Sequence, residues 1–318
     1  MDLLGDALAI AGVRGTVGAR IGAAGKWGTA WTKATSAVFY AVTAGTAWIT
    51  LPGKAATRLM PGDVVLLPIG TGHSLGSDPD GVVNECDHGA AERARSEGNV
   101  LRFGTGEVET QILGASYEYD PAVSTQVLAS LPEFVHLRAD NGGSCLEDTV
   151  RLLGRELACP QLASAVVLNR LVDVLLVQLL RVWLARKPAE ARGSWLGVLS
   201  DPLVSVAMTK LHQDPAKAWT VELLAAEMAV SRTTLARRFR EVAGETPGGY
   251  LTRWRMDLAA VRLRDTDETL EAIARSVGYT SVYAFSRAFR RARLEAPGRF
   301  RSTSRARAGQ GLVSVPAG

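Results

Sequence analysis

Arginine residues recur with the same spacing in two stretches of the sequence. Arg237 and Arg240 lie three positions apart in the first stretch, and Arg287 and Arg290 repeat this spacing fifty positions later. A guanidinium group can donate two parallel hydrogen bonds to the edge of a guanine, and it also binds phosphate. Residues three positions apart share one face of a helix. The pattern therefore predicts two helices that each present arginines to a nucleic acid.

The stretches that carry these arginines are variants of one another. Residues 237–250 align with residues 287–300 at fourteen positions, of which six are identical. An internal repeat indicates one structural unit used twice. Each unit reads as a short helix, a tight turn and an arginine-bearing helix, which is the layout of a helix-turn-helix motif. An ordinary helical bundle with solvated arginines is the alternative interpretation, and a single motif would not exclude it.

The first unit is predicted between Thr220 and Val242. Thr220 and Ser231 are suited to cap its two helices. At 100° per residue, Leu235 and Phe239 of the second helix face inward. The residues expected to meet DNA from this unit are Arg232, Thr233, Ala236, Arg237 and Arg240.

The second unit repeats this arrangement around Phe285 and Phe289. Its outward residues are Tyr283, Ser286, Arg287 and Arg290. Three arginines on the flanks are predicted to contact phosphates, which position a protein on DNA without reading its sequence. These are Arg238, Arg291 and Arg293. A helix predicted at Tyr250–Arg264 would span about 22 Å and could hold the two reading helices near one DNA turn apart.

Charge divides the 318 residues unequally. Residues 1–199 hold 17 Lys and Arg against 20 Asp and Glu, whereas residues 200–318 hold 19 against 12. A basic module joined to a slightly acidic one is typical of a polyanion-binding domain attached to a domain with another task. The three cysteines form neither a disulfide framework nor a CxxC metal site, and the sequence contains no convincing signal peptide or membrane span. A cytoplasmic protein is therefore expected.

The first 120 residues read as β-structure. Residues 37–42, 46–51 and 64–67 are predicted strands because they are rich in β-branched, aromatic and other apolar residues. Pro52-Gly53 and Pro61-Gly62 are predicted turns, since proline fixes φ and glycine supplies positive φ. Short strands separated by such turns indicate a barrel or a sandwich.

Helical periodicity follows from residue 121 to residue 187, with helices predicted at Leu146–Leu157 and Ala163–Ala185. The second helix is apolar on nearly every side, so it is either the core of its own domain or a contact between two chains. Its predicted homodimer contacts are Leu175, Leu176, Leu179 and Leu180. Residues 188–199 are predicted to be a linker, and residues 302–318 a disordered tail.

Several residues of the repeated region form a specific signature. It consists of Ala225, Gly244, Pro247, Trp254, Ile273-Ala274, Val277–Tyr279, Phe285–Phe289 and Pro297. This signature resembles that of the AraC/XylS family of bacterial transcription regulators. The resemblance implies a seven-helix DNA-binding domain with two helix-turn-helix motifs. Carried over by position, it implies base contacts from Thr233, Ala236 and Arg237 in the first motif and from Val282, Tyr283, Ser286 and Arg287 in the second.

Residues 61–73 resemble a conserved motif of the cupin barrel, a domain that senses small molecules in many members of that family. Enzymatic cupins bind a metal through an upstream His-x-His and a glutamate, yet no histidine lies between Ala30 and Thr57. His73 is therefore interpreted as a turn residue satisfied by the backbone, and neither a metal nor a cofactor is expected. The alternatives for the cluster of Cys86, Asp87 and His88 are a metal site, an oxidant-sensitive site and a solvated loop.

The sequence thus predicts an α+β protein. Its parts are a cupin-like β-barrel at 1–120, a helical dimerisation segment at 121–187, a linker at 188–199 and an all-α DNA-binding domain at 200–301. We expect a homodimeric transcription regulator that binds double-stranded promoter DNA, responds to an unidentified small molecule or redox signal, and has RNA polymerase as a candidate partner. The alternatives are a metal-dependent cupin enzyme with a DNA-binding tail and a DNA-repair methyltransferase fused to such a tail. Both need metal ligands that the sequence lacks.

Overall fold

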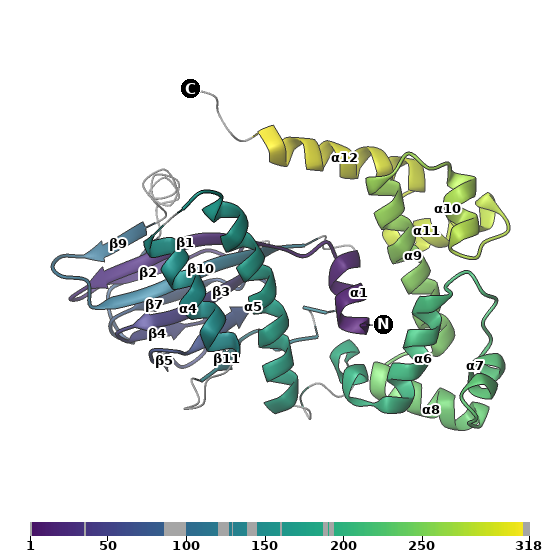
Figure 1. Cartoon of the computed structure of the whole chain (residues 1–318), viewed down its shortest axis with the longest axis horizontal. Helices are drawn as coiled ribbons and strands as arrows, with labels where there is room; N and C mark the ends of the chain where they lie inside the picture. The colour runs from purple at the N-terminus through teal and green to yellow at the C-terminus, as the bar shows by residue number, and fades with distance from the viewer. Residues whose placement is uncertain are drawn as a thin grey trace. The chain divides into compact units, whose positions relative to one another are not determined.

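The computed structural model describes residues 2–34, 36–85, 100–119, 127–128, 130–138, 145–159, 161–186, 190 and 194–313, with the backbone alone from 307. The chain divides into two compact units (Figure 1). The sheet unit comprises residues 12–120 and 128–187, and the helical unit comprises residues 1–11, 121–127 and 188–318. The predicted first domain at 1–120 therefore needs correction, because its first eleven residues pack with the helical unit.

The sheet unit contains two β-sheets. In hydrogen-bonding order, the first consists of β11 (Val135–Leu137), β6 (Val64–Leu67), β3 (Ala37–Ala44), β10 (Thr110–Glu118), β1 (Arg14–Ala24) and β9 (Val100–Gly104). The second consists of β5 (Thr57–Leu59), β4 (Ala47–Thr50), β7 (His73–Gly76), β2 (Gly28–Trp31) and β8 (Asn84–Glu85). No ladder between described strands joins one sheet to the other, so of the predicted alternatives, a barrel or a sandwich, the structure has an open two-sheet arrangement and not a closed barrel.

Three predicted strands and two predicted turns are confirmed. The strands are β3, β4 and β6, and the turn residues Gly53 and Gly62 have φ values of 71° and 89°. β3 pairs antiparallel with both β10 and β6, which places it inside the first sheet. Side chains from both sheets form one apolar core, which includes Ile21, Val42, Ile49, Leu67 and Leu75.

Helices α4 (Cys145–Ala158) and α5 (Ser164–Arg186) pack against each other, and α5 covers β1 (Figure 1). The Tyr117 hydroxyl donates to the Val172 carbonyl at 2.9 Å, and Gly15 N donates to the Asp173 carboxylate at 2.8 Å. Both bonds tie α5 to the first sheet.

The prediction that four leucines of α5 contact a second chain is wrong. Leu175, Leu176, Leu179 and Leu180 are each at most 2% exposed within a single chain. The helix is apolar on most sides because it lies between a sheet and another helix. Its leucines therefore belong to the core of their own chain.

The helical unit is assembled from distant parts of the sequence. Its elements are α1 (Leu3–Ile10), the 3₁₀ helix η1 (Trp195–Ser200), α6 (Pro202–Gln213), α7 (Val221–Glu227), α8 (Arg232–Ala243), α9 (Pro247–Asp265), α10 (Leu270–Ser276), α11 (Val282–Arg293) and α12 (Pro297–Val313). Helix α1 packs against α6 and α9. Asp6 accepts a hydrogen bond from the His212 ring at 3.4 Å.

Two segments that we predicted to be irregular are helical. η1 lies in the predicted linker, and it packs on α6 and α8 because Trp195, Leu196 and Val198 are apolar and buried. α12 continues to Val313 through most of the predicted tail. Within α12, Arg305 forms an ion pair with Asp267 at 2.7 Å.

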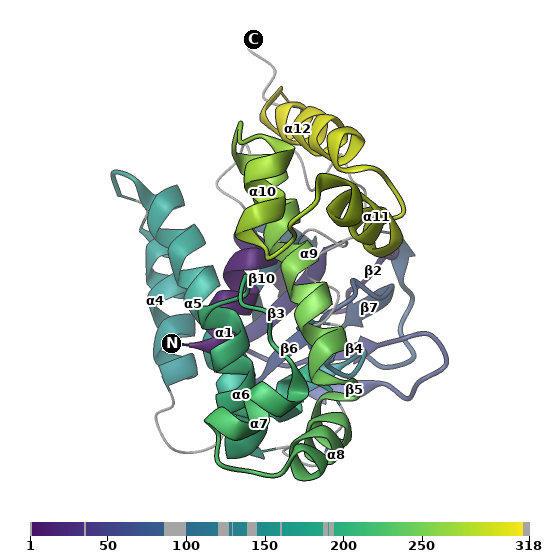
Figure 2. The same cartoon turned by 90° about the vertical axis from the view of Figure 1, so that its right-hand side faces the viewer.

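Helix α9 is the central element of the helical unit. Figure 2 shows it between the α7–α8 pair and the α10–α11 pair. On this helix Leu251 and Trp254 are buried, whereas Leu258 and Val261 are only partly buried. Met256, Ala259, Ala260 and Leu263 are also buried. The helix is covered on more than one side because both motifs pack on it.

The repeated units end their second helices with different residues. Gly244 follows α8 with a φ of 76°, and Leu294 follows α11 with a φ of 61°. The left-handed conformation is costly for a residue with a Cβ atom, whereas glycine adopts it freely. Leu294 is 90% exposed, so its side chain contributes almost no apolar burial in return.

We expect Leu294→Gly to raise the free energy of unfolding by about 0.5–1 kcal/mol, because relief of the left-handed strain exceeds the extra entropy of glycine in the unfolded chain. Urea denaturation followed by circular dichroism measures this change. The matched reverse variant, Gly244→Leu, should be less stable than the parent. A Leu294→Gly protein that is no more stable than the parent would contradict the assignment of strain to this position.

Candidate nucleic-acid interface and sensor pocket

The two helix-turn-helix motifs use the same helix caps. The Thr220 hydroxyl accepts a hydrogen bond from the amide three residues later at 3.1 Å, and Ser231 does so at 3.0 Å. Thr269 and Ser281 occupy the corresponding positions in the second motif and make the same bonds at 3.2 and 3.4 Å. A side-chain cap satisfies an amide that has no partner within the helix. The sequence therefore fixes where all four helices begin.

The turns of the two motifs also correspond. Val230 N donates to the Ala225 carbonyl at 3.1 Å, and Tyr279 N donates to the Ala274 carbonyl at 2.8 Å. The second turn passes through Gly278 at a φ of 82°, where a Cβ would lie 2.7 Å from the Ala216 carbonyl oxygen. A glycine is required at that position because its backbone approaches the neighbouring loop so closely.

Helices α8 and α11 present the predicted contact residues away from the core. Leu235, Phe239, Phe285 and Phe289 are fully buried and fix the inner face of each helix. On the outer faces, the exposed residues are Arg232, Thr233, Arg237 and Arg240 of α8 and Tyr283, Arg287, Arg290 and Arg291 of α11. The remaining predicted residues, Ala236, Val282 and Ser286, are partly exposed.

Most arginines of α8 have an acidic partner in the free protein. Arg232 pairs with Glu222 at 2.8 Å, and Arg237 pairs with Glu241 at 2.7 Å. The Arg237 side chain is nevertheless 64% exposed. Its ion pair with Glu241 is therefore solvated and weak, and a DNA acceptor can compete for the guanidinium.

Helix α11 is more strongly cationic than α8. It contains four arginines and no acidic residue. Arg290 and Arg291 form no ion pair with any residue that the structure describes. The Arg287 guanidinium lies 5.9 Å from the centre of the Tyr283 ring, and Tyr283 is 72% exposed. The ring thus restrains Arg287 and leaves the hydrogen-bond donors of its guanidinium available.

Of the three predicted phosphate contacts, that of Arg293 needs correction, whereas Arg238 is paired within the protein but keeps a side chain that is 48% exposed. The Arg293 side chain is only 6% exposed and forms an ion pair with Asp257 of α9, so it stabilises the domain. Arg238 donates to Asp201 at 2.7 Å, and the same carboxylate caps α6 through Val204 N at 2.9 Å. Sequence spacing cannot reveal such partners, because Asp201 and Asp257 lie more than thirty residues away.

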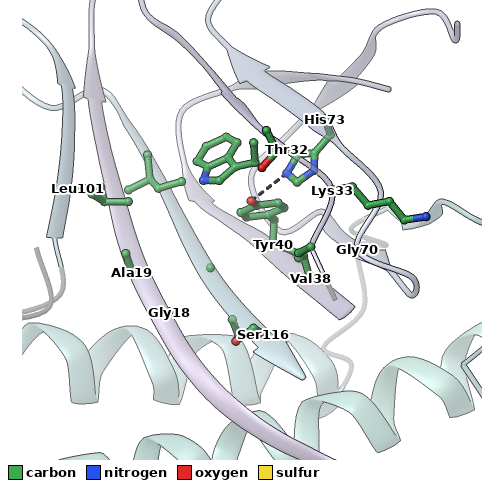
Figure 3. Close-up of a pocket in the computed structure, with 15 residues that line it drawn as sticks. Gly18, Ala19, Thr32, Lys33, Val38, Tyr40, Gly70, His73, Leu101 and Ser116 are labelled. Atoms are coloured by element: carbon green, nitrogen blue, oxygen red, sulfur yellow. Dashed lines mark hydrogen bonds between the residues drawn. The ribbon is translucent and has the colours of Figure 1, made fainter. Parts of the chain in front are cut away.

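A pocket of about 290 Å³ opens in the sheet unit between the two sheets (Figure 3). Its aromatic lining is formed by Trp31, Tyr40 and His73. Trp31 stacks on His73 with ring centres 5.4 Å apart and an angle of 16° between the planes. Leu101 and Ala19 lie on the opposite side of the pocket from Tyr40 and His73. Of these residues, our sequence analysis named only His73.

His73 is hydrogen-bonded at both ring nitrogens. Nδ1 lies 2.8 Å from the Thr71 carbonyl and must donate to it, so Nε2 accepts from the Tyr40 hydroxyl at 2.9 Å. Burial lowers the pKa of His73, and the ring is neutral at pH 7. The predicted backbone hydrogen bond of His73 is thus present.

The pocket does not fit the resident metal of enzymatic cupins. His73 is the only histidine, cysteine or carboxylate side chain among the pocket residues that the structure describes, and both of its nitrogens are already engaged. No group of three such side chains occurs elsewhere in the described ranges. The predicted cluster of Cys86, Asp87 and His88 lies outside the described residues.

Comparison with known proteins identifies both halves of the chain. Residues 2–185 match the cupin family, and residues 224–303 match the helix-turn-helix domain family. A protein of Streptomyces lividans named as an AraC-like transcription regulator is 36% identical over 95% of this chain and 98% of its own length. The chain belongs to the AraC-like transcription regulators.

Two further proteins illustrate the range of similarity. The HTH-type transcriptional regulator AlkR of Acinetobacter baylyi is 26% identical over 88% of this chain and 92% of its own length. The crystallised DNA-binding domain of AdpA, solved with a target DNA, is 34% identical and covers 35% of this chain and 99% of that domain, with a TM-score of 0.33.

This AraC-like protein is a DNA-binding transcription regulator of the α+β class, as the sequence predicted. The Streptomyces lividans and Acinetobacter baylyi relatives are both named as transcription regulators. A helix of the length and apolarity needed to cross a bilayer is absent from the described part of the chain.

The contrast between Arg291 and Arg293 yields a test within one helix of this AraC-like regulator. Arg291→Met should weaken binding to every duplex and reduce the slope of log affinity against log salt by about 1, because it removes the phosphate contact that we predict for Arg291. Arg293→Met should lower the free energy of unfolding by roughly 3 kcal/mol, because it removes the buried partner of Asp257. Fluorescence anisotropy with labelled DNA and urea denaturation measure the two effects. If Arg291→Met destabilises the fold, or Arg293→Met does not, the assignments must be exchanged.

Proposed function

We propose that the protein reads a promoter sequence with α8 and α11 as paired recognition helices. The observation that carries the proposal is the repetition of one capped helix-turn-helix with an arginine-bearing outer face. The major groove admits a helix and displays a distinct pattern of donors and acceptors for each base pair. α9 has 19 residues and a length of about 28 Å, which suits a connector between two motifs on one face of a duplex.

The base-reading residues follow from exposure and chemistry. Arg237 and Arg287 are the residues proposed to bind guanine, and Thr233, Ala236, Val282, Tyr283 and Ser286 are proposed as their neighbours in the grooves. Arg232, Arg240, Arg290 and Arg291 are proposed to contact phosphates or flanking bases. The two motifs differ in charge, so α11 is expected to supply more of the sequence-independent attraction.

The sheet unit is proposed to sense a small molecule in the pocket beside Tyr40 and His73. A ligand that binds one conformation better than another shifts the population that can engage DNA. A metal-dependent cupin enzyme is not favoured, because the pocket offers one side chain of the ligand type and that side chain is already hydrogen-bonded. A redox signal through the exposed Cys145 or Cys159 is the second candidate input.

A homodimer is proposed through the outer face of α4 and α5 instead of the buried leucines. Leu152 of α4 and Val166, Val167 and Val174 of α5 are 42–62% exposed. Val167 and Val174 lie seven residues apart and therefore share one side of α5. An exposed apolar face of this kind is typical of a surface that contacts a second copy. RNA polymerase is proposed as a partner of the promoter-bound protein.

The proposal that the protein reads a promoter sequence is tested with the full chain and an operator selected from random duplexes. Arg237→Ala and Arg287→Ala should each weaken the free energy of binding to that operator by about 1–3 kcal/mol and relax the preference at one local base position. Repeating the selection with each variant measures the change in preference. Failure of the parent protein to enrich any sequence, or an affinity that does not fall with salt, would refute sequence-specific binding.

The proposal for the dimer is tested by Val174→Glu, with Val206→Glu as the matched control. Val206 lies on α6 in the helical unit and is 49% exposed, close to the 45% of Val174. Val174→Glu should give a folded monomer in sedimentation, because a charge would have to be desolvated in the apolar contact. Val206→Glu should stay dimeric. A parent protein that is monomeric at tens of micromolar concentration would overturn the proposal.

A further inference from the structure

Arg255 of α9 contacts segments that belong to both halves of the helical unit. Its Nε atom donates to the Pro215 carbonyl at 2.6 Å, and its Nη2 atom donates to the Lys217 carbonyl at 2.8 Å. Both carbonyls lie in the loop that leads from α6 into α7, the first helix of the first motif. The Arg255 guanidinium also lies 6.0 Å from the centre of the Tyr279 ring, in the turn of the second motif. One side chain therefore links the two motifs.

The loop between α6 and α7 is held to the first motif. Trp219 Nε1 donates to the Asp214 carbonyl at 2.8 Å, and Lys217 N donates to the Asp214 carboxylate at 3.1 Å. Lys217 Nζ pairs with Glu227 of α7 at 2.5 Å, and α7 packs on α8. The loop ends at Thr220, the N-cap of α7. A displacement of this loop therefore displaces the first motif.

The turn of the second motif is held to α11. The Tyr279 ring packs edge-on against the fully buried Phe285, with ring centres 5.9 Å apart. The neighbouring Gly278 approaches the loop directly. A Cβ at this position would lie 2.7 Å from the Ala216 carbonyl oxygen and 2.8 Å from Arg255 Nη2. The loop, the guanidinium and the turn are thus in close contact at one place.

We call residues 214–219, Arg255 and residues 278–279 the inter-motif joint. Its geometry is important because a small rotation is amplified over the distance between the reading helices. Over about 34 Å, one turn of DNA, a rotation of about 10° moves the far helix by about 6 Å. One base pair rises by only about 3.4 Å. A guanidinium suits such a joint because its planar fork gives several directed hydrogen bonds, whereas an ammonium is a point charge.

We propose that Arg255 is a positioning residue that fixes the angle between α8 and α11, and so the separation of the two DNA segments that the protein accepts. The proposal rests on the proposed reading of DNA by both helices and adds the residue that sets their spacing. Arg255 acts through the helices and is not assigned a DNA contact, because its hydrogen bonds run to carbonyls of the protein.

The test uses the full-length protein and the operator selected from random duplexes. The base positions that relax in Arg237→Ala and Arg287→Ala mark the segments read by α8 and α11. Duplexes with one base pair inserted or removed between these segments are compared with the operator by fluorescence anisotropy. The parent should bind the altered duplexes more weakly by about tenfold or more, because half-site spacing follows from the geometry of the protein. Arg255→Met should bind the operator more weakly and reduce this discrimination to about threefold or less.

Three further variants separate positioning from charge and from stability. Arg255→Lys should discriminate as poorly as Arg255→Met, because it keeps the charge and loses the fork. Arg262→Met is the matched control on the same helix, since it removes two bonds to Glu268, at 3.0 and 2.8 Å, outside the joint. It should discriminate as well as the parent. Gly278→Ala should reduce discrimination from the side of the turn, and it replaces Arg255→Met if circular dichroism shows that Arg255→Met is unfolded.

Equal discrimination in the parent and in Arg255→Met, its recovery in Arg255→Lys, or its loss in Arg262→Met would overturn the assignment. A parent that binds all spacings equally, or an operator whose bases are read by one helix alone, would also overturn it, although sequence-specific binding would stand. A parent that enriches no sequence would instead overturn the proposed function itself.

Discussion

The helical unit depends on the contact of a histidine ring with a tryptophan ring. His212 of α6 lies flat on Trp254 of α9, with ring centres 3.6 Å apart and planes within 3°. The His212 Nε2 atom accepts from the Tyr250 hydroxyl at 2.5 Å, and Phe239 of α8 packs edge-on against Tyr250. Burial lowers the pKa of His212 to about 4, so the ring is neutral and its other nitrogen donates to Asp6. This stack therefore joins α6, α8 and α9 through Phe239 and Tyr250.

The second motif is held to the same helix by different forces. Phe285 and Phe289 join Met256 and Leu263 of α9 in an apolar cluster, and Arg293 pairs with Asp257 beside it. One helix thus supports two copies of a motif with unlike packing. The two copies also differ in the charge of their outer faces. Two arginines of α8 form ion pairs with glutamates of the protein, whereas α11 contains four arginines and no acidic residue. Repeated local structure therefore does not imply equal roles on DNA.

The sequence predicted features set by local chemistry and missed those set by distant partners. The caps at Thr220 and Ser231 were predictable because a hydroxyl at a helix start has one common use. The leucines of α5 were assigned to a dimer because an apolar helix does not reveal what covers it. The structural role of Arg293 depends on its ion pair with Asp257, which lies thirty-six residues away in the sequence. The pocket lining of Trp31 and Tyr40 was not predicted because the face toward which a strand residue points depends on sheet packing.

Helix α1 has a consequence for how the chain is made. The partners Asp6 and His212 are separated by 206 positions in the sequence. At about 5–20 residues per second, a ribosome needs roughly 10–40 s to produce the second partner after the first. During that interval Leu3, Leu4 and Ala7 lack the surface that buries them in the finished helical unit. All residues of the sheet unit are synthesised within the same interval, so this unit can fold before the remaining helices are available to pack against α1.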